Sequence, residues 1–448
     1  MSHLKTQSQK DKSHMNTHQM LYKFHNEPNY GEIAKNVAEF AKTHPYSEIV
    51  AYIDALPFTP KMSMLTSPKP LKIFGRDLIE QSAIDQMNTC LSIPVAIRGA
   101  LMPDAHLGYA MPIGGVIELD NAISPSFVGY DISCMVMLTI FDLSHEKFMA
   151  NRLQYAQILK SVTRFGRDTF PEGSRQHYVM SDSRWNETNI LRGLKDLAQQ
   201  QLGTSGGGNH FADLVLLAND RVGLLTHSGS RGAGHKFATH YTKVAKEYTD
   251  KIATNVSKGY EWFSIDSDEG QEYLIGMDLL GEYAEANHAL IHLHFENESN
   301  LNSSGSIKNK HNFAWQEWND PYFPNGIVNH RKGATPAYFG QLGLIPGSSG
   351  TPSYVVMGLG NTASLNSSSH GAGRVGSRKQ AIEHHDKPEF EEHMIQEDIL
   401  HFGLSPDETY QAYKPIAAVM QAQTQNVQVI SKMYPKVVIM SGAESDDG

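Results

Sequence analysis

The stretch SFVGYDISC, residues 126–134, follows an apolar, glycine-rich run at 111–119 that is typical of a buried strand and its turn. Asp131 and Cys134 are three positions apart, so one helical turn or a tight loop would bring the carboxylate and the thiol together. Such a pair can form half of a metal site. Taken alone, the pattern is more typical of a capping aspartate and a small buried cysteine. Histidine motifs elsewhere in the chain favour the metal site.

The composition is that of a globular protein, with 40% of the 448 residues hydrophobic and 19% charged. No apolar run approaches the ~18 residues of a membrane span, and no signal peptide opens the chain, so we expect no membrane association. The two cysteines, Cys90 and Cys134, form no disulfide framework and favour a cytoplasmic location, where thiols stay reduced. The net charge of −10 leaves phosphate binding to local clusters of Arg and Lys.

Three segments are expected. Residues 1–20 are polar and lack apolar periodicity, which predicts a disordered tail. Residues 21–70 form a helical extension and linker, with helices at 31–44 and 47–56 followed by a run of prolines. Residues 71–448 form the main body, which starts with a strand at 71–74 and a helix at 78–91. The fold class is therefore mixed α/β (α+β), as a single large domain with a small N-terminal helical appendage.

Within the main body, apolar runs predict strands at 95–101, 135–141, 355–359 and 437–440. Helical periodicity predicts helices at 237–257 and 277–292 and a C-terminal helix that ends near 433. The polar residues 297–310 predict a loop, and residues 330–334 a basic turn with phosphate-binding character.

Three histidines recur in one context, each beside an apolar run or small residues. They are His210 after a glycine-rich loop, His227 at the end of an apolar strand, and His311 at the start of an apolar-aromatic segment. Taken singly, each is more typical of a core or surface histidine whose hydrogen bonds are satisfied within the protein or by water. Together with Asp131 and Cys134 they suit two adjacent divalent ions with a shared thiolate. Ligand type alone favours zinc, because manganese normally prefers oxygen.

A fourth histidine, His370, lies in a run of Ser, Gly and Arg residues. A neutral imidazole could attack phosphorus there, with Arg374 and Arg378 stabilising the transferring charge. The alternative is a helix-capping serine run with an incidental histidine. Asp104, at a strand end just before His106, is as typical of a turn as of a site.

Over about residues 71–448 the sequence resembles the RtcB family of RNA-splicing ligases. The motifs that carry the resemblance are MPDAHLGYAMPIGGV, VGYDISC, GTSGGGNHF, HSGSRGAGH, KHNFAWQE, HRKGATPA, IPGSSGTPSY, SSSHGAGR and AYK. The resemblance implies a family-specific α/β fold around a central cleft, two Mn²⁺ ions and ligation that depends on GTP. One ion would bind Asp131, Cys134 and His210, and the other Cys134, His227 and His311. The residues that would surround the nucleotide are Asn209, Asp213, Ser348, Ser353, Ala372, Gly373, Arg374 and Tyr413.

The implied reaction starts when His370 attacks the α-phosphorus of GTP and becomes guanylylated, with Asp104 as a further active-site carboxylate. GMP then passes to an RNA 3′-phosphate, which is itself opened from a 2′,3′-cyclic phosphate where needed, and a 5′-hydroxyl end displaces GMP. The resemblance also implies broken RNA or tRNA-splicing substrates and an archease-like activating partner. Two alternatives stay open: a metal-dependent cyclic phosphodiesterase that does not seal, and a non-catalytic protein that binds RNA ends.

The chain departs from the family pattern at four positions. Ser133 and Met135 stand where the family usually has Gly, and Asp213 stands where a Glu near guanine is expected. Ser441 replaces a terminal Lys that contacts guanine. These departures indicate a divergent paralogue, in which we expect weaker guanine selectivity.

Overall fold

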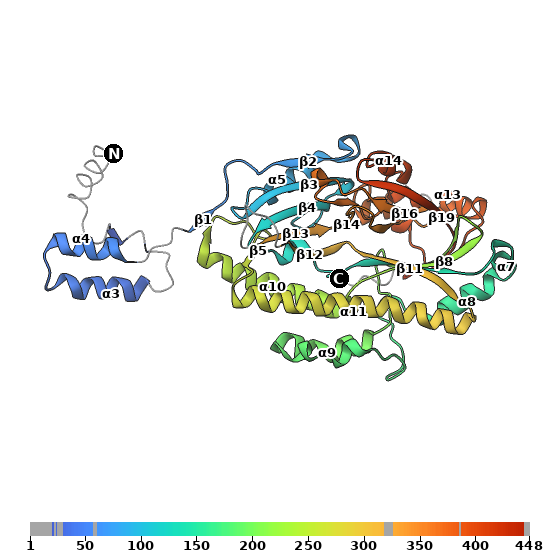
Figure 1. The fold of residues 1–448 in the computed structure, drawn as a ribbon, viewed down its shortest axis with the longest axis horizontal. Coiled ribbons are helices and arrows are strands. Elements are labelled where there is room, and N and C mark those ends of the chain that lie inside the picture. The colour runs from blue at the N-terminus through green and yellow to red at the C-terminus, as the bar shows by residue number, and fades with distance from the viewer. Residues whose placement is uncertain are drawn as a thin grey trace. The chain divides into compact units, whose positions relative to one another are not determined.

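Two sheets form the framework that carries the predicted site residues (Figure 1). The computed structural model describes residues 20–21, 24, 30–56, 61–317, 326–384 and 387–442. The predicted disordered tail lies outside these ranges except at its last residue, and so does part of the predicted linker. Contacts divide the chain into two units, 1–63 with 247–256, and 64–246 with 257–448. Among the described helices, none combines the length and the apolarity needed to cross a bilayer.

The larger sheet has eight strands and bends back on itself. Its path runs β11 (Ser303–Lys310), β6 (Met135–Phe141), β8 (Arg221–Ser228), β7 (Phe211–Leu217), β19 (Val427–Met440), β16 (Ser353–Gly358) and β15 (Leu342–Ile345), with β18 (Leu400–Phe402) paired parallel to β19. The Asn309 side chain on β11 accepts from the Leu344 N–H on β15 at 2.8 Å and lies 3.4 Å from the Leu344 carbonyl. This amide bridges the first and last strands of the path.

Alternate residues of these strands face two cores, as the period of two in a strand requires. Val215 and Leu225 point into the core that the bent sheet encloses. Leu214 and Leu224, one position earlier, pack on the outer side with Leu159 of α8 (Arg152–Val162).

The smaller sheet has five strands and lies beside the first. They are β12 (Asn312–Glu317), β13 (Ile327–Lys332), β4 (Ile113–Asp120), β3 (Ala96–His106) and β2 (Leu71–Ile73). Short pairs join β14 (Ala334–Pro336) to β17 (Ser367–Ser369) and β5 (Ala122–Ile123) to β10 (Phe263–Ser264). The mixed helix and sheet content confirms the predicted α/β class.

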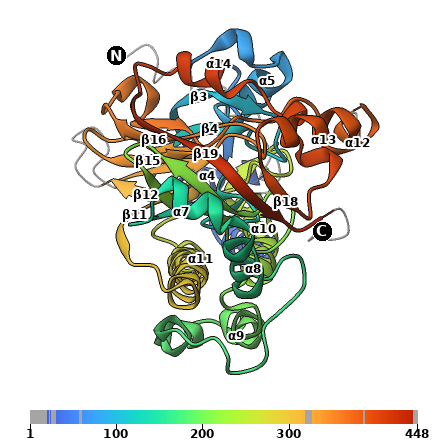
Figure 2. The ribbon, with the colours of Figure 1, turned by 90° about the vertical axis from the view of Figure 1, so that its right-hand side faces the viewer.

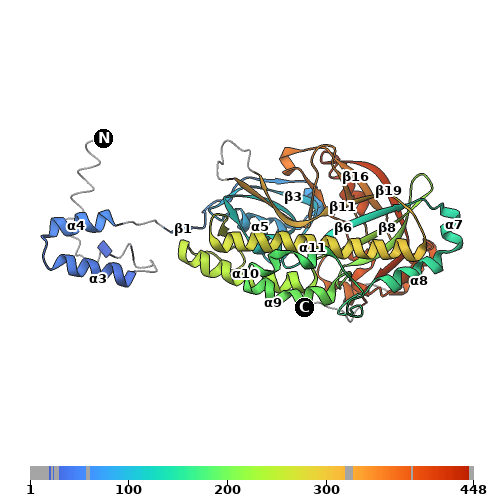
Figure 3. The same ribbon diagram turned by 60° about the horizontal axis from the view of Figure 1, so that its bottom comes forward.

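Helices cover the sheets on two sides. Figures 2 and 3 show α8, α9 (Asn189–Gln201) and α11 (Asp268–Ser299) on one side of the strands, and Figure 2 shows α5 (Gln81–Cys90) and α14 (Ile416–Gln421) on the other. Ser267 caps α11 by accepting from the Gly270 N–H, and Asp268 and Glu269 favour its positive N-terminus. The other helices of this unit are α6 (Pro125–Val128), α7 (His145–Ala150), α10 (Arg231–Ile252), which extends into the first unit, α12 (Arg378–His384) and α13 (Lys387–Gln396).

The first unit contains α3 (Tyr30–Ala41) and α4 (Tyr46–Ala55), which confirm the two predicted N-terminal helices. Their apolar faces share one cluster that includes Ile33, Val37 and Ile53. In the same unit, β1 (Met62–Ser63) pairs with β9 (Ala253–Thr254), so part of the expected linker forms a strand.

Three predictions about single elements are wrong. The expected loop at 297–310 is largely strand β11, whose exposed polar residues conceal the alternation that usually identifies a strand. The expected basic turn at 330–334 lies mostly in β13, where Arg331 is buried and donates to the Ser367 Oγ and to the Leu365 carbonyl. The expected C-terminal helix ends at Gln421, and most of its remainder is the long strand β19.

Candidate metal and nucleotide site

The candidate site lies where the two sheets meet. His311 is the single residue between β11 and β12, so its backbone belongs to the junction. The His311 N–H donates to the Cys134 carbonyl at 3.0 Å, and the Ser133 N–H donates to the Asn312 carbonyl at 2.7 Å. These bonds fix the loop before β6 against the junction.

Asp131 and Cys134 are brought together by a tight turn. The Cys134 N–H donates to the Asp131 carbonyl at 3.2 Å, and Ser133 adopts a φ of 58°. This left-handed conformation favours glycine, so the turn holds Ser133 in a backbone conformation that is strained for a serine. Gly229 also lies against this turn. A Cβ at Gly229 would lie 2.0 Å from the Asp131 Oδ1, so a larger residue does not fit there.

The donor atoms of the five predicted metal ligands gather around the Cys134 thiol. The Cys134 Sγ lies 3.0 Å from the His227 Nε2 and 3.5 Å from the His210 Nε2. The His210 Nε2 lies 3.0 Å from the Asp131 Oδ2, and the His227 Nε2 lies 3.2 Å from the His311 Nε2. The donor atoms form two groups, Asp131 with Cys134 and His210, and Cys134 with His227 and His311, each spanning no more than 4.8 Å. Cys134 belongs to both groups.

Backbone carbonyls orient two of the imidazoles. The His210 Nδ1 lies 2.8 Å from the Ser205 carbonyl, and the His227 Nδ1 lies 3.1 Å from the Asn209 carbonyl. Since a carbonyl can only accept, each Nδ1 carries the proton and each Nε2 presents a lone pair to the centre. Buried, converging lone pairs of nitrogen, sulfur and oxygen are a donor set that fits divalent cations.

Burial shifts the pKa values of the residues in this donor set. It raises the pKa of the Cys134 thiol, and the Asp131 charge raises it further. Burial lowers the pKa values of His227 and His311, which keeps both imidazoles neutral. Burial would also raise the pKa of Asp131, but when the His210 imidazole is protonated its hydrogen bond and charge outweigh burial and lower that pKa to about 2. The Nδ1 of His311 is buried without a hydrogen-bond partner.

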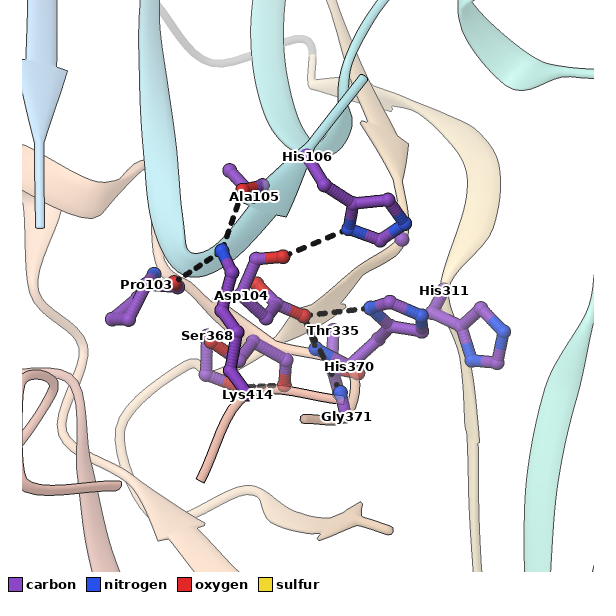
Figure 4. Close-up of polar contacts among 12 residues, drawn as sticks. Pro103, Asp104, Ala105, His106, His311, Thr335, Ser368, His370, Gly371 and Lys414 are labelled. Carbon is purple, nitrogen blue, oxygen red and sulfur yellow. Dashed lines mark hydrogen bonds and ion pairs between the residues drawn. The ribbon is translucent and has the colours of Figure 1, made fainter. Parts of the chain in front are cut away.

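His370 lies next to this donor set, at the end of β17. Its ring centroid is 4.9 Å from that of His311 (Figure 4). The His370 Nδ1 lies 2.7 Å from the Asp104 Oδ2, which also accepts from the backbone N–H of His370 at 3.0 Å. The hydrogen bond to the carboxylate places the proton on Nδ1 and leaves a lone pair on Nε2. Burial alone would raise the pKa of Asp104, but the His370 hydrogen bond and nearby cationic groups, including Lys414, lower it.

Lys414 supports the same strand end. Its Nζ donates to the carbonyls of Pro103 at 3.2 Å and Ala105 at 2.7 Å, on both sides of Asp104 (Figure 4). Gly373 packs against this backbone, since a Cβ there would lie 2.2 Å from the Asp104 carbonyl oxygen.

A cleft opens beside His370, His311 and His227. All eight predicted nucleotide residues line it: Asn209, Asp213, Ser348, Ser353, Ala372, Gly373, Arg374 and Tyr413. They come from the loop before β7, from β7, from the loop and strand at 345–358, and from the segments at 371–374 and 409–413. The structure thus brings residues separated by up to about two hundred positions into one cavity.

Sequence reasoning missed two acidic residues at this cleft, Glu408, which lines it, and its neighbour Asp407. Glu408 accepts from Arg374 at 3.2 Å and from Arg378 at 2.6 Å, and Tyr413 donates to it as well. Asp407 accepts from Arg378 too. The cationic neighbourhood expected for His370 is therefore balanced by two carboxylates. Both lie in a short 3-10 helix, Pro406–Glu408, whose polar sequence has no pattern by which they could have been found.

Asp213 lies among apolar residues of the cleft. Phe211, Val438 and Met440 line the wall near it, and none of these three was predicted. The Asp213 Oδ1 is buried without a hydrogen-bond partner, and burial raises the pKa of this carboxyl well above its usual value. The wall thus combines apolar surface with one unsatisfied polar group, as small-molecule sites commonly do.

A buried polar network supports the strand that carries His227. The His288 Nε2 lies 3.2 Å from the Ser228 carbonyl, and the His288 Nδ1 lies 2.6 Å from the Thr226 hydroxyl. That hydroxyl lies 2.8 Å from the His292 Nε2, and the His292 Nδ1 lies 2.7 Å from the Thr139 hydroxyl. His288 and His292 lie on α11, so the network joins α11 to β8 and β6 directly behind the donor set.

Comparison with known proteins places the chain. The family model described as "tRNA-splicing ligase RtcB" matches residues 86–188 and 174–441. The "RNA-splicing ligase RtcB" of Escherichia coli K12 is 30% identical over 403 residues, which cover 84% of this chain and 98% of the relative. The "tRNA-splicing ligase RtcB" of Archaeoglobus fulgidus is 28% identical, covering 70% of this chain and 80% of the relative. The "RNA-splicing ligase RtcB homolog 1" of Entamoeba histolytica is 26% identical, covering 80% and 83%. The chain belongs to the RtcB family.

Proposed function

We propose that the protein is an RNA ligase that uses GTP and Mn²⁺ to join a 3′-phosphate or 2′,3′-cyclic phosphate end to a 5′-hydroxyl end. The observation that carries this proposal is the contact between His370 and His311, with ring centroids 4.9 Å apart. It puts a nucleophile with a free lone pair beside a donor set for two cations. RNA comes into the proposal from the relatives, which are named RNA-splicing ligases.

Asp131, Cys134 and His210 would hold one cation, and Cys134, His227 and His311 the other. When bound, the cations would withdraw charge from phosphate oxygens during transfer. The donor types alone favour zinc, and manganese is proposed because of the family resemblance.

His370 would form the covalent link to the nucleotide. Its Nε2 attacks the α-phosphorus of GTP, a P–N bond forms, and the bond to pyrophosphate breaks. Asp104 accepts the Nδ1 proton in a hydrogen bond throughout and stabilises the cationic imidazole that develops. An oxygen of the RNA 3′-phosphate then attacks the same phosphorus, and the P–N bond breaks. Finally the RNA 5′-hydroxyl attacks the activated phosphate, loses its proton and displaces GMP.

The nucleotide would occupy the cleft lined by the eight predicted residues. Arg374 is held by Glu408 and would contact phosphate from a fixed position. Asp213 would face the base from the apolar wall, where its Oδ1 lacks a partner. Because Asp213 is one methylene shorter than the Glu of the family pattern and Ser441 stands in place of its Lys, we expect the site to select guanine less strictly.

The test is covalent transfer from α-labelled GTP to the protein in Mn²⁺. We expect labelled wild-type protein and no label on His370→Ala, whereas His393→Ala, a histidine outside the cleft-lining set, keeps it. No transfer from GTP or any other NTP would contradict the proposal. Product analysis on RNA with a cyclic-phosphate end separates the alternatives. Joined strands support ligation, phosphate-ended strands alone support a phosphodiesterase, and tight binding without any product supports a non-catalytic role.

Two further elements belong to the proposal. A cytoplasmic location is proposed because the cysteines, Cys90 and Cys134, are both free, and thiols stay reduced in that compartment. An archease-like activator is proposed from the family resemblance alone. We expect its addition to increase the number of ligation turnovers, and an unchanged turnover would contradict that part.

A further inference from the structure

An exposed tyrosine next to the site is held in an unusually rigid way. Tyr109 is 89% exposed, in the turn between β3 and β4. Exposed aromatic rings at such turns are normally free to move with the backbone. Here Gln86 on α5 binds the turn through its side-chain amide. It accepts from the Gly108 N–H at 3.0 Å and donates to the Gly108 carbonyl at 2.7 Å and the Tyr109 carbonyl at 3.3 Å.

The backbone of this turn also requires glycine. A Cβ at Gly108 would lie 2.3 Å from the Met111 carbonyl oxygen, so no other residue fits without a shift. Both features fix the backbone that carries an aromatic ring almost fully open to solvent. No core packing accounts for such an arrangement, because the ring is not in the core.

Tyr109 is part of an aromatic cluster with Tyr130 and His235. The rings of Tyr109 and Tyr130 meet edge to face, with centroids 5.8 Å apart, and Tyr130 stacks on His235 at 5.2 Å with 30° between the ring planes. Tyr130 directly precedes Asp131, the carboxylate of the first donor group. His235 is exposed in the first turns of α10.

The cluster adjoins the first donor group through Tyr130 and Asp131, whereas the nucleotide cleft adjoins the second donor group. His311 and His227, of the second group, line the cleft together with His370, whereas Asp131 is not among its lining residues. A substrate end that approaches the first donor group would come close to the residues beside Asp131. Exposed aromatic faces bind unpaired bases by stacking, and they accept any base because each has a π face.

We propose that Tyr109, Tyr130 and His235 form a stacking platform for the terminal unpaired base of an RNA end at the donor set. This inference rests on the proposed function. The base could belong to the strand with the 3′-phosphate or to the strand with the 5′-hydroxyl, and the chemistry of stacking is the same for both. The experiment below distinguishes the two strands.

The test measures binding of single-stranded RNA to the full chain by fluorescence anisotropy, with Mn²⁺ and without GTP. Each of the two strands is prepared with its normal terminal nucleotide and with an abasic one. Tyr109→Ala should weaken binding of one strand about tenfold, as loss of one stacked base does. Tyr109→Phe should bind as the wild type does, because it keeps the ring. Tyr178→Ala, which removes a tyrosine that is 77% exposed elsewhere, is the matched control and should have no effect.

The abasic strands supply the decisive comparison. On the strand whose base stacks, the abasic end should bind wild type and Tyr109→Ala equally. If Tyr109→Ala binds both normal strands as Tyr178→Ala does, or weakens abasic and normal ends alike, the platform is wrong. If the variant gives either of these results while the wild-type protein takes up GTP label, the platform alone is overturned. Wild-type protein that takes up no label and binds neither strand overturns the proposed function, and the platform with it.

Discussion

At the scale of single residues, the Asp104 carboxylate is the group on which His370 depends. Its Oδ2 lies within hydrogen-bond distance of the His370 Nδ1 and accepts from the backbone N–H groups of His370 and Gly371. Asp104→Asn keeps the shape but removes the charge that selects the reactive tautomer. We expect the rate of GTP label transfer to fall at least about a hundredfold. Asp142→Asn, which alters an exposed carboxylate paired with Arg221, should keep the wild-type rate, and an undiminished rate in Asp104→Asn would contradict the assignment.

Cys134 belongs to both donor groups, which gives the metal site a stoichiometric signature. A serine hydroxyl is not ionised at neutral pH, so Cys134→Ser should retain neither cation. His311→Ala removes a ligand from one group and should retain about one cation per chain. Cys90→Ser, at the other buried cysteine, should retain as many as the wild type. Elemental analysis of the purified proteins checks this, and equal metal content in Cys134→Ser and wild type would remove the shared-ligand claim.

Lys332 provides a test of burial at a single residue. Its Nζ donates to the Ser126 carbonyl, and burial lowers the pKa of the ammonium group to about 8. The unfolded chain, with an ordinary lysine pKa of about 10.4, binds more protons between these values, so stability should rise with pH there. Wild type should therefore gain stability relative to Lys332→Met as pH rises from about 8 to about 10. Urea unfolding measures the difference, and parallel curves for the two proteins would show that the ammonium is not buried.

At the scale of elements, a chain of hydrogen bonds connects α11 to β8 and β6, and the donor and acceptor of each bond in it can be assigned. The Ser228 carbonyl can only accept, so the His288 Nε2 donates and its Nδ1 accepts from the Thr226 hydroxyl. The Thr226 oxygen then accepts from His292, whose Nδ1 accepts from the Thr139 hydroxyl. Burial lowers the pKa values of both histidines, His288 to about 4, which keeps them in the neutral form that this chain requires.

Thr226→Val should break this chain without changing the size of the side chain. Two buried imidazoles lose a partner, and we expect the free energy of unfolding to fall by about 2 kcal/mol or more. Thr242→Val, which removes a hydroxyl bonded to the Ala238 carbonyl within α10, is the matched control and should cost less. Urea denaturation of both variants decides the point. A loss in Thr226→Val no larger than in Thr242→Val would mean that water or repacking satisfies the histidines.

Elements with a continuous apolar run or a clear helical period could be predicted. Strand β6 has the bounds that its apolar run predicts, and α3 and α4 follow helical periodicity. Prediction failed where tertiary contacts override the pattern. Strand β11 is polar and pairs with β6 along its length, and β13 buries Arg331 because Ser367, Leu365 and the Trp315 ring compensate the charge. Neither the pairing of β11 with β6 nor the contacts of Arg331 can be read from a local stretch of sequence.

At the scale of the whole molecule, the proximity of the five candidate donors could be predicted and the way the fold achieves it could not. Motif context and family resemblance predict the five residues, and the structure brings them together in two groups that share Cys134. What the sequence does not contain is the junction of two sheets at His311, which aligns loops from residues 131 and 311. Glu408 and the apolar wall around Asp213 come from segments far apart in the sequence, so no local pattern predicts that they line one cleft.

The N-terminal unit has a core of its own. The apolar faces of α3 and α4 pack with Met20, Leu21 and Phe24, and none of the residues that line the nucleotide cleft or form the donor groups precedes residue 104. Lys61, Met62 and Ser63, by contrast, bind residues 250–254 through a side-chain hydrogen bond and the β1–β9 pair.

A chain that begins at Lys61 should therefore keep GTP label transfer and the wild-type urea midpoint, since it retains β1 and the whole site. A chain that begins at Leu71 also loses β1, leaves β9 unpaired and should unfold at lower urea concentration. Label transfer and urea unfolding on the two truncated chains and the full chain measure both effects. Loss of label transfer in the chain that begins at Lys61 would show that the helical unit contributes to catalysis, which the residues around the cleft give no reason to expect.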